Sequence, residues 1–429
     1  MSRLYADIIV DISQEKLDKT FQYEIPENLI SQTEIGKKVR IPFGNGRREL
    51  TGYVVGISRE AKIDPKRIKP ITALEEQGVE IESHLIQLAA WIARNYGSTM
   101  NQALKTVLPV KEKAAEKEKR QICLNASEEE VRKLKEECER KHYTAKLRLL
   151  EALLREKTLD YTEAVKEMKI STPVIKGLEE KGILKVIRQR CYRNPFEGMC
   201  AERKSFQLSP EQRTVTEEIF REWKQENPRP CLIKGVTGSG KTQVYMELIS
   251  HVLKQGQQVI VLIPEIALTY QNVSRFYSRF GDCVSLMNSR LSQGERFDQF
   301  ERAKKGEVSI VIGPRSALFT PFPNLGLILI DEEHETSYKS EKTPCYHARE
   351  TAIERARMEG AFVVMGSASP SVESYYKGKE GIYKLLYLNS RYEQRALPTV
   401  TVVDLKRELK TGNLSIFRTS LTAKFRDRL

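Results

Sequence analysis

From about residue 206 onward, short apolar runs of strand length alternate with stretches of helix-forming residues. These runs lie near Leu232, Val259, Val308, Leu325 and Phe362. Continuous apolar strands separated by helices are typical of a parallel β-sheet that is covered by helices on both faces. The pattern therefore predicts an α/β fold for this part of the chain.

The first 105 residues or so follow a different pattern, in which apolar and polar positions alternate as they do in β-strands. Two such stretches flank Gly44-Asn45-Gly46, which predicts a β-hairpin with basic residues at its tip. Apolar residues then recur at helical spacing from His84 to Tyr96, where Trp91 and Tyr96 fit a core better than a platform for stacking bases. We expect a small β-rich domain closed by a helix.

Between these two regions, residues 110–120 are highly charged and contain almost no apolar side chain larger than alanine, which predicts a solvated linker or an exposed helix. Residues 121 to about 190 have the order of a winged-helix module, with Pro173 early in its last helix. Lys176 and Lys185 belong to a basic cluster around that helix and the next strand. The cluster suits contacts to DNA phosphates, but it also suits the solvated face of a structural or protein-binding module.

The amino-acid composition indicates that the protein surface attracts polyanions. The 429 residues carry a formal net charge of +13, which supports an acidic partner without identifying one. No apolar run approaches the ~18 residues that a membrane helix needs, and acidic residues near the start do not fit a signal peptide. Seven cysteines without a C-x-x-C pair suit reduced thiols and predict no zinc site in this chain. We expect a cytoplasmic protein with no membrane partner.

A glycine loop is the central chemical signal, where the sequence reads C-L-I-K-G-V-T-G-S-G-K-T from Cys231 to Thr242. It fits the pattern G-x-x-x-x-G-K-[ST], in which backbone N–H groups and a helix N-terminus surround phosphate oxygens. The pattern assigns the β and γ phosphates of ATP to Lys241 and Mg²⁺ to Thr242. The other loop residues expected to hold the nucleotide are Gly235, Gly238, Ser239 and Gly240. The alternative, a glycine turn that binds nothing, fits poorly with the strand before the loop and the helix after it.

A second signal is an apolar strand that delivers carboxylates at its end, in the sequence L-G-L-I-L-I-D-E-E-H from Leu325 to His334. Ligands of open α/β sheets bind at this end of the strands. Asp331 is placed to hold Mg²⁺ through its water shell, and Glu332 to orient or deprotonate the attacking water in phosphoryl transfer. By itself the segment could be an acidic loop. Together with the glycine loop it predicts an ATP site, which a kinase, a transporter subunit or a motor could use.

Further segments of this region resemble the first motor lobe of superfamily 2 helicases. These segments are P-E-I-A-L-T at 264–269, G-P-R-S-A-L-F at 313–319, D-E-E-H at 331–334 and G-S-A-S-P-S at 366–371. The run that continues from D-E-E-H as E-T-S-Y-K-S-E-K-T-P-C-Y-H-A-R-E, and K-T-F-Q-Y-E-I-P and V-R-I-P-F-G near the N-terminus, are similar to the PriA family. The resemblance spans nearly the whole chain and implies a RecA-like lobe.

The resemblance implies roles for individual residues. Gln212 matches a glutamine that reads adenine, and His334 matches a residue that links the nucleotide to DNA. Arg315 lies in a DNA-contacting loop. An aromatic-rich loop that couples DNA to hydrolysis would contain Tyr338, Tyr346, His347 and Arg349. The pocket for a terminal nucleotide would be formed by Phe21, Gln22, Tyr23 and Lys69, although Gln22 stands where the family often has aspartate.

The resulting division of the chain has a β-rich domain that binds DNA 3′ ends, a charged linker, a winged-helix domain, a P-loop helicase lobe, and the start of a connection to a second lobe. We place these at 1–108, 109–120, 121–195, 200–395 and 396–429 respectively. The resemblance implies that a full-length family member also has a second lobe with an arginine finger and a zinc-binding region, and we expect neither of them within this sequence. Loss of such an arginine costs related NTPases roughly 10³- to 10⁵-fold in rate.

The function implied by the resemblance is that of an ATP-dependent 3′ to 5′ DNA helicase. It would act on stalled forks and D-loops and initiate primosome assembly, in the bacterial cytoplasm and associated with the nucleoid. Its partners would be forked and single-stranded DNA, the single-strand DNA-binding protein and other primosome proteins. We expect this chain to bind DNA but not to unwind it, and ATP binding is left open. The alternatives are an ATP-gated DNA-binding scaffold without translocation and a P-loop kinase.

Overall fold

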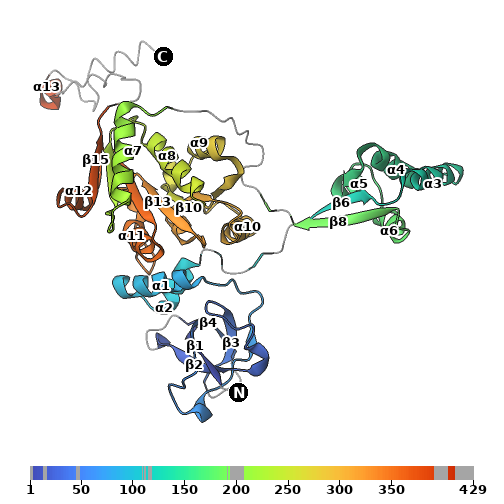
Figure 1. Ribbon diagram of the computed structural model, residues 1–429, viewed down its shortest axis with the longest axis horizontal. Coiled ribbons are helices and arrows are strands. Elements are labelled where there is room, and N and C mark those ends of the chain that lie inside the picture. The colour runs from blue at the N-terminus through green and yellow to red at the C-terminus, as the bar shows by residue number, and fades with distance from the viewer. Residues whose placement is uncertain are drawn as a thin grey trace.

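The computed structural model describes residues 3–12, 17–44, 49–108, 110, 113–114, 118–190, 192–193, 207–390 and 404–410. Figure 1 shows a β-rich region at the N-terminus, a helical module on two long strands, and a larger lobe built around a β-sheet. In the part of the chain that is described, no helix has both the length and the apolar character needed to cross a membrane.

The N-terminal region is a five-stranded antiparallel sheet in the order β2-β1-β4-β3-β5. Its strands are β1 (Leu4–Val10), β2 (Phe21–Ile25), β3 (Lys38–Pro42), β4 (Glu49–Ser58) and β5 (Ala73–Leu74), with short 3₁₀ turns η2 (Glu27–Leu29) and η3 (Pro65–Arg67). Strands β3 and β4 form the predicted hairpin, whose tip at residues 45–48 lies outside the described residues. Two helices follow, α1 (Ser83–Tyr96) and α2 (Met100–Val107).

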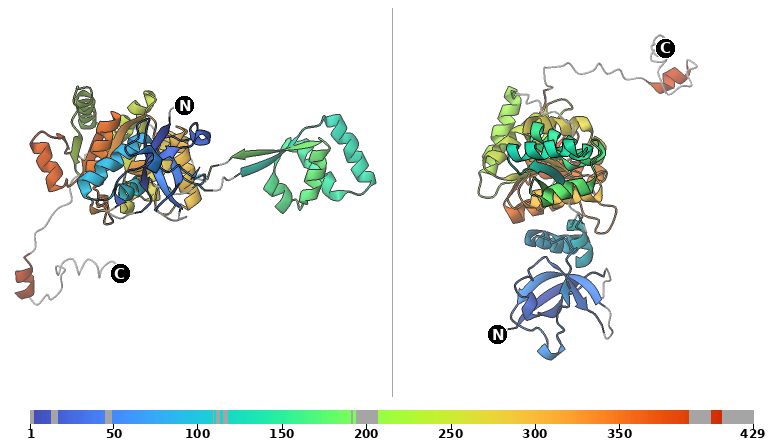
Figure 2. Two further views of the ribbon diagram at one scale, coloured as in Figure 1. Left: turned by 90° about the horizontal axis from the view of Figure 1, so that it is seen from below. Right: turned by 90° about the vertical axis from the view of Figure 1, so that its right-hand side faces the viewer.

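Helices α1 and α2 join the N-terminal sheet to the lobe. Leu85, Leu88 and Leu104 are buried in one apolar core together with residues of the lobe, and α1 contacts α11. At the edge of this junction, the Lys304 ammonium lies 3.1 Å from Glu80 and 3.0 Å from Glu82. The right-hand view of Figure 2 shows the two helices between the sheet and the lobe.

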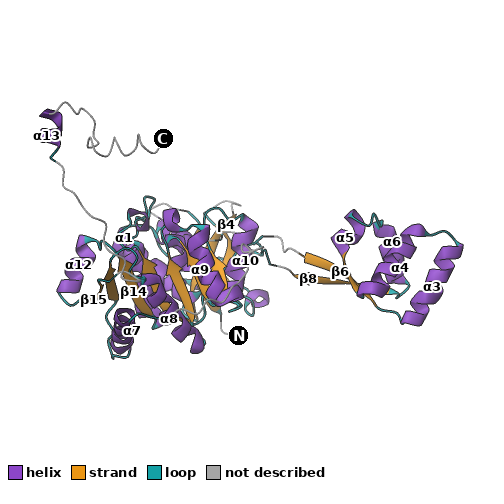
Figure 3. Ribbon diagram, turned by 90° about the horizontal axis from the view of Figure 1, so that it is seen from above, coloured by secondary structure: helices purple, strands orange, loops and turns teal. Residues whose placement is uncertain are grey.

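The middle region has the helix and strand order of a winged helix, with a small sheet in the order β7-β6-β8. Its elements are β6 (Glu118–Leu124), α3 (Glu128–Arg140), α4 (Thr144–Glu156), β7 (Thr158–Asp160), α5 (Tyr161–Lys166), α6 (Thr172–Glu180) and β8 (Leu184–Arg190). Figures 2 and 3 show this module projecting from the lobe on β6 and β8. Residues 118–120, which we expected in the linker, already belong to β6 because they pair with Arg188–Arg190 of β8.

The lobe contains a seven-stranded parallel sheet in the order β11-β12-β10-β13-β14-β9-β15. Its strands are β9 (Cys231–Gly235), β10 (Gln258–Leu262), β11 (Val284–Leu286), β12 (Ile310–Gly313), β13 (Leu325–Asp331), β14 (Phe362–Ser367) and β15 (Lys384–Leu388). The five runs singled out in the sequence are the five inner strands β9, β10, β12, β13 and β14. The mixed α/β fold is therefore confirmed, and the sheet gains two edge strands, β11 and β15.

Helices cover both faces of this sheet (Figure 3). They are α7 (Pro210–Trp223), α8 (Lys241–Lys254), α9 (Tyr270–Phe280), α10 (Gln293–Lys304), α11 (Ala348–Glu359) and α12 (Val372–Lys379), with α13 (Leu405–Lys410) further along. Short 3₁₀ turns are η4 (Glu265–Ala267), η5 (Gly281–Cys283), η6 (Arg315–Phe319) and η7 (Thr336–Tyr338). Side chains of the inner strands alternate between two separate cores; in β10, Ile260 and Leu262 belong to one and Val259 and Val261 to the other.

Candidate functional site

The glycine loop connects the end of β9 to the start of α8, at the carboxyl edge of the sheet. Gly238 and Gly240 have φ angles of +82° and +80°, a left-handed conformation that other residues rarely adopt. A Cβ atom on Gly240 would also lie 2.3 Å from the Gln212 side-chain nitrogen. Glycine is therefore required at this position by both the backbone conformation and the close packing of Gln212.

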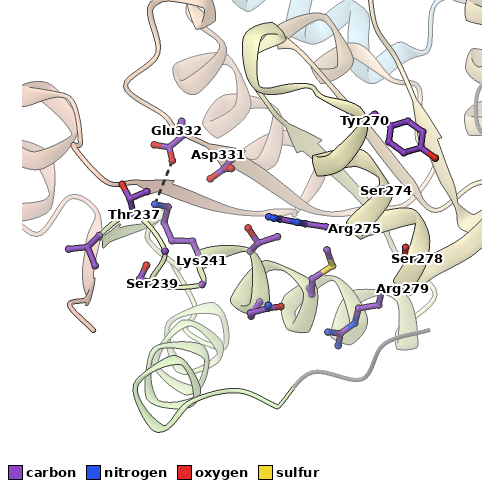
Figure 4. A pocket seen from close by; sticks show the side chains of 16 residues that line it. Thr237, Ser239, Lys241, Tyr270, Ser274, Arg275, Ser278, Arg279, Asp331 and Glu332 are labelled. Carbon is purple, nitrogen blue, oxygen red and sulfur yellow. Dashed lines mark ion pairs between the residues drawn. The ribbon is translucent and has the colours of Figure 1, made fainter. Parts of the chain in front are cut away.

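The loop borders a cavity of about 880 Å³ that it shares with the end of β13 and one face of α9. The lining includes Val236–Gln243 from the loop and α8, and Asp331 and Glu332 from the acidic segment. Figure 4 shows these side chains converging from elements that are far apart in the sequence. The sequence-predicted nucleotide residues Gly238, Ser239, Gly240, Lys241 and Thr242 are thus brought together with Asp331 and Glu332.

Lys241 is almost fully buried at the centre of this cavity. Its ammonium donates a hydrogen bond to the Gly235 carbonyl at 3.0 Å and lies 3.6 Å from a Glu332 carboxylate oxygen. These partners hold the cation at the phosphate loop with its charge partly balanced. Phosphate oxygens that enter the cavity would compete with both partners for the ammonium.

Asp331 is held by Tyr245 of α8, a residue that the sequence reading did not single out. The Tyr245 hydroxyl donates to Asp331 Oδ1 at 3.0 Å. Burial raises the pKa of Asp331 above its ordinary value, and the negative charge of Glu332 raises it further. A cation beside Asp331 would relieve this cost, and the Thr242 hydroxyl lines the same cavity. The pair therefore fits Mg²⁺, which prefers one or two carboxylates and keeps part of its water shell.

Glu332 and His334 connect the cavity to the segment that follows β14. Glu332 has a positive φ of 46°, uncommon outside glycine, and its Oε2 accepts a hydrogen bond from the Ala368 N–H at 3.4 Å. His334 Nδ1 lies 3.6 Å from the same oxygen and 2.6 Å from Ser367 Oγ. His334 thus contacts both the acidic segment and β14, and its expected role in linking the nucleotide to DNA stays a prediction.

Glu333, which the sequence reading passed over, forms a buried network with Arg349. Its carboxylate accepts hydrogen bonds from Arg349 Nη1 at 2.9 Å, from the Ser371 N–H at 2.8 Å and from Ser374 Oγ at 2.9 Å. The relative side-chain exposure is 0% for Glu333 and 6% for Arg349. The Arg349 guanidinium therefore lies inside the lobe in this structure, and its expected contact with DNA stays a prediction.

Tyr338 and Tyr346 also depart from the expected stacking on bases. Their relative exposures are 1% and 4%, so their rings are not available to DNA in this conformation. The Tyr338 hydroxyl shares its one hydrogen between the carbonyl groups of Leu262 at 3.0 Å and Asp331 at 2.7 Å. Tyr338 thereby fixes the carboxyl ends of two adjacent strands. The burial of these two tyrosines could not be predicted from the sequence, because the local residue pattern does not distinguish an exposed tyrosine from a buried one.

Arg315 and Gln212 are both engaged within the lobe. Arg315 Nη1 donates to the carbonyl groups of Ser337 at 2.8 Å and Lys339 at 2.6 Å, so it braces the loop after the acidic segment. Gln212 Nε2 donates to the Ser239 carbonyl at 2.9 Å, which ties α7 to the glycine loop. The roles of Arg315 toward DNA and of Gln212 toward adenine remain predictions.

The N-terminal residues expected to form one pocket are divided between two faces of the sheet. Lys69 Nζ donates to the Gly44 carbonyl at 2.6 Å, and the Tyr23 hydroxyl donates to the Pro42 carbonyl at 3.1 Å, which places both beside the end of β3. Phe21 packs edge-on against Phe43 in the same region, with ring centroids 5.5 Å apart.

Gln22 lies on the opposite side of β2, because successive strand residues alternate. Its Nε2 donates to the Glu60 carbonyl at 3.0 Å and its Oε1 accepts from the Lys62 N–H at 2.7 Å. In this structure its side chain therefore does not join the other three residues.

Lys176 on α6 and Lys185 on β8 are exposed on the winged-helix module, as a phosphate-binding role requires. Their contact with DNA remains a prediction. Within the described residues, no group of three or more His, Cys, Asp or Glu side chains is placed to hold a metal ion.

Comparisons with known proteins bear on the N-terminal region and on the lobe. Residues 7–109 match the family of the PriA 3′DNA-binding domain (3′BD), and residues 205–368 match the family described as type III restriction enzyme, res subunit. A solved structure of RecG bound to a three-way DNA junction covers 48% of this chain and 27% of its own, at 22% identity and a TM-score of 0.38, which supports no argument about function.

Curated relatives match the chain along nearly its full length. Replication restart protein PriA of Bacillus subtilis (strain 168) is 34% identical over 99% of this chain and 60% of its own length. Replication restart protein PriA of Chlamydia pneumoniae is 33% identical over 100% of this chain and 57% of its own length. The chain thus spans somewhat more than half the length of these relatives. Its resemblance to the PriA replication restart family, expected from the motifs, is confirmed.

Proposed function

We propose that this chain carries the DNA-binding regions and the first motor lobe of an ATP-dependent 3′ to 5′ DNA helicase. The helicase would recognise stalled forks and D-loops and initiate primosome assembly for replication restart. The observation that carries the proposal is the cavity in which Lys241, Asp331 and Glu332 meet, on a chain whose residues 7–109 match a 3′ DNA-binding domain. Proposed partners are forked and single-stranded DNA, the single-strand DNA-binding protein and other primosome proteins.

In the proposed reaction, the phosphates of ATP lie over the glycine loop and the N-terminus of α8. Lys241 exchanges its contacts with the Gly235 carbonyl and Glu332 for phosphate oxygens. Glu332 is then free to orient the attacking water. Bound Mg²⁺, held by Asp331 and Thr242, would neutralise charge on the phosphates.

Coupling of this site to DNA is proposed to run through the ordered segments around it. His334 links Glu332 to Ser367, and Arg349 links Glu333 to the segment after β14. Arg315 braces the loop at Ser337 and Lys339. A shift of Glu332 on ATP binding would therefore displace both the loop around Ser337 and Lys339 and the end of β14. This supports the coupling roles proposed for His334 and Arg315.

For the DNA-binding part, we propose that residues 1–108 hold the 3′ end of a nascent strand and residues 121–195 contact backbone phosphates. Phe21, Tyr23 and Lys69 gather near Gly44 at the end of β3, where Tyr23 is buried and Phe21 and Lys69 are the members accessible to a DNA end. Lys176 and Lys185 offer cations on the exposed face of the winged-helix module. The proposed lobe extends over 200–395.

The test of the motor proposal is Lys241→Ala, measured by ATP binding and by binding to a model fork at fixed salt. We expect ATP binding to be lost and fork binding to persist, because the phosphate loop lies in a different region from the sheet and the winged-helix module. Lys254→Ala, at the exposed end of the same helix, should change neither. Equal loss of both activities in Lys241→Ala would contradict the proposed division of labour.

The test of the 3′-end proposal compares forks whose leading strand ends at the junction in a 3′ hydroxyl or a 3′ phosphate. We expect tighter binding to the hydroxyl, and loss of this preference in Phe21→Ala. A chain that binds both forks equally would have a general basic surface in place of an end-recognition pocket.

A further inference from the structure

Helix α9 forms a wall of the nucleotide cavity that the motifs did not indicate. One of its faces carries Tyr270, Ser274, Arg275, Ser278 and Arg279, all of which line the cavity. Two arginines on one helix face beside a phosphate-binding loop add positive charge where the proposed ligand is strongly negative. The two arginines are not equally available to a ligand.

They differ in their partners. Arg279 is already used, since its Nη2 lies 3.2 Å from a Glu247 carboxylate oxygen and 3.2 Å from Ser250 Oγ, both on α8. Arg275 makes neither a hydrogen bond nor an ion pair with any described residue. Figure 4 shows its side chain reaching across the cavity toward Lys241 and Asp331, while Arg279 lies away from them. Arg275 is thus a guanidinium that faces the phosphate loop and has no partner among the described residues.

The position of α9 indicates which part of a nucleotide Arg275 would meet. Figure 1 shows α7 and α9 on opposite sides of α8. Gln212 of α7 contacts the glycine loop on its own side and is proposed to read adenine. A triphosphate that extends from that side across the loop would direct its terminal phosphate toward Glu332 and α9.

We propose that Arg275 binds the terminal phosphate of ATP and thereby makes this lobe favour ATP over ADP. The inference rests on the proposed function, in which the cavity holds ATP. A guanidinium suits this contact because its fork of N–H donors matches two phosphate oxygens. It would also offset the negative charges of Asp331 and Glu332, which would otherwise repel the terminal phosphate.

The experiment measures the Kd of MgATP and MgADP by equilibrium dialysis for the whole chain and for Arg275→Ala and Arg275→Lys. Arg275→Ala should weaken ATP binding roughly tenfold or more and leave ADP binding within about twofold. The Kd of MgATP for Arg275→Lys should lie between those of the unaltered chain and Arg275→Ala, because lysine retains the positive charge but not the fork of N–H donors. Arg221→Ala, which removes an exposed arginine from α7 outside the cavity, should match the unaltered chain.

The outcomes separate this inference from the proposal on which it rests. If the unaltered chain binds neither nucleotide, the ATP-binding function itself is refuted. If it binds ATP and Arg275→Ala binds ATP equally well, the role of Arg275 is refuted while the function stands. An equal loss for ATP and ADP would also refute a contact with the terminal phosphate. Far-ultraviolet circular dichroism of each variant shows whether the fold is retained.

Discussion

The buried ion pair between Glu333 and Arg349 allows a quantitative test of how the lobe is held together. The perturbation is Arg349→Met, which keeps the length of the side chain and removes its charge. Glu333 would then remain as a carboxylate with 0% side-chain exposure. Removing one partner of a buried pair typically costs about 3–5 kcal/mol.

The local geometry places the expected cost at the lower end of this range. Glu333 keeps three donors after the change, namely the N–H and hydroxyl of Ser371 and the hydroxyl of Ser374. We therefore expect the free energy of unfolding of the lobe to fall by about 3 kcal/mol. The double variant Glu333→Gln with Arg349→Met should recover part of this loss, because it removes the buried charge.

The assay is urea unfolding followed by the fluorescence of Trp223, which stacks on Phe362 within the lobe at a ring-centroid distance of 4.8 Å. The other tryptophan, Trp91, lies in the N-terminal region and is replaced by phenylalanine throughout. The matched control is Arg357→Met on the same helix, whose side chain is 70% exposed. It should leave the unfolding curve unchanged.

Two results would refute this reasoning. A midpoint for Arg349→Met that coincides with that of Arg357→Met would mean that the buried pair does not stabilise the lobe. A double variant that is no more stable than Arg349→Met alone would mean that the isolated carboxylate is not the source of the loss. A constant slope of free energy against urea is required for either comparison.

Further predictions concern pH and salt. Burial lowers the pKa of His84 below its ordinary value of 6.5, so the unfolded chain gains a proton before the folded chain, and the free energy of unfolding should decrease as the pH falls below about 6.5. Between pH 7.5 and 5.5, the melting temperature of His84→Gln should decrease less than that of the unaltered chain. The control His142→Gln, which replaces an exposed histidine, should show the same decrease as the unaltered chain. Identical pH profiles for His84→Gln and the unaltered chain would contradict the role of His84. Replacement of Lys176 and Lys185 by alanine should lower the slope of log affinity for DNA against log salt by about one for each phosphate that is no longer neutralised. Lys141→Ala, which removes a lysine paired with a glutamate on α3, should not alter this slope. If the double replacement leaves the slope unchanged, the winged-helix module would instead have a structural or protein-binding role.

Several elements could be predicted from local sequence because each one carries its own physical signature. The inner strands β10, β12 and β13 are almost entirely buried and therefore read as unbroken apolar runs. The edge strands β11 and β15 were missed for the converse reason. Strand β11 has only three residues, one of them a serine, and β15 begins with a lysine and includes the exposed Tyr387, so neither shows an unbroken aliphatic run of strand length.

The charged start of β6 illustrates the same limit in another region. Residues 118–120 lack apolar character and were read as linker, yet they pair with β8. Backbone hydrogen bonds between strands do not depend on the type of side chain, so this pairing leaves no local trace in the sequence. The same holds for Glu333 and Arg349, which lie sixteen residues apart and meet only through the packing of α11 against β13.

The amino-acid sequence alone therefore sufficed for the five inner strands of the lobe, the glycine loop and the two carboxylates at the end of β13, because backbone conformation and burial in a parallel sheet impose residue types at neighbouring positions. The three-dimensional packing was needed to show that Tyr338, Tyr346 and Arg349 are buried, that Gln22 turns away from Tyr23 and Lys69, and that Arg275 faces the phosphate loop. These properties depend on which side of an element meets which distant neighbour. Side-chain burial and charge pairing arise from those contacts, and local residue patterns do not encode them.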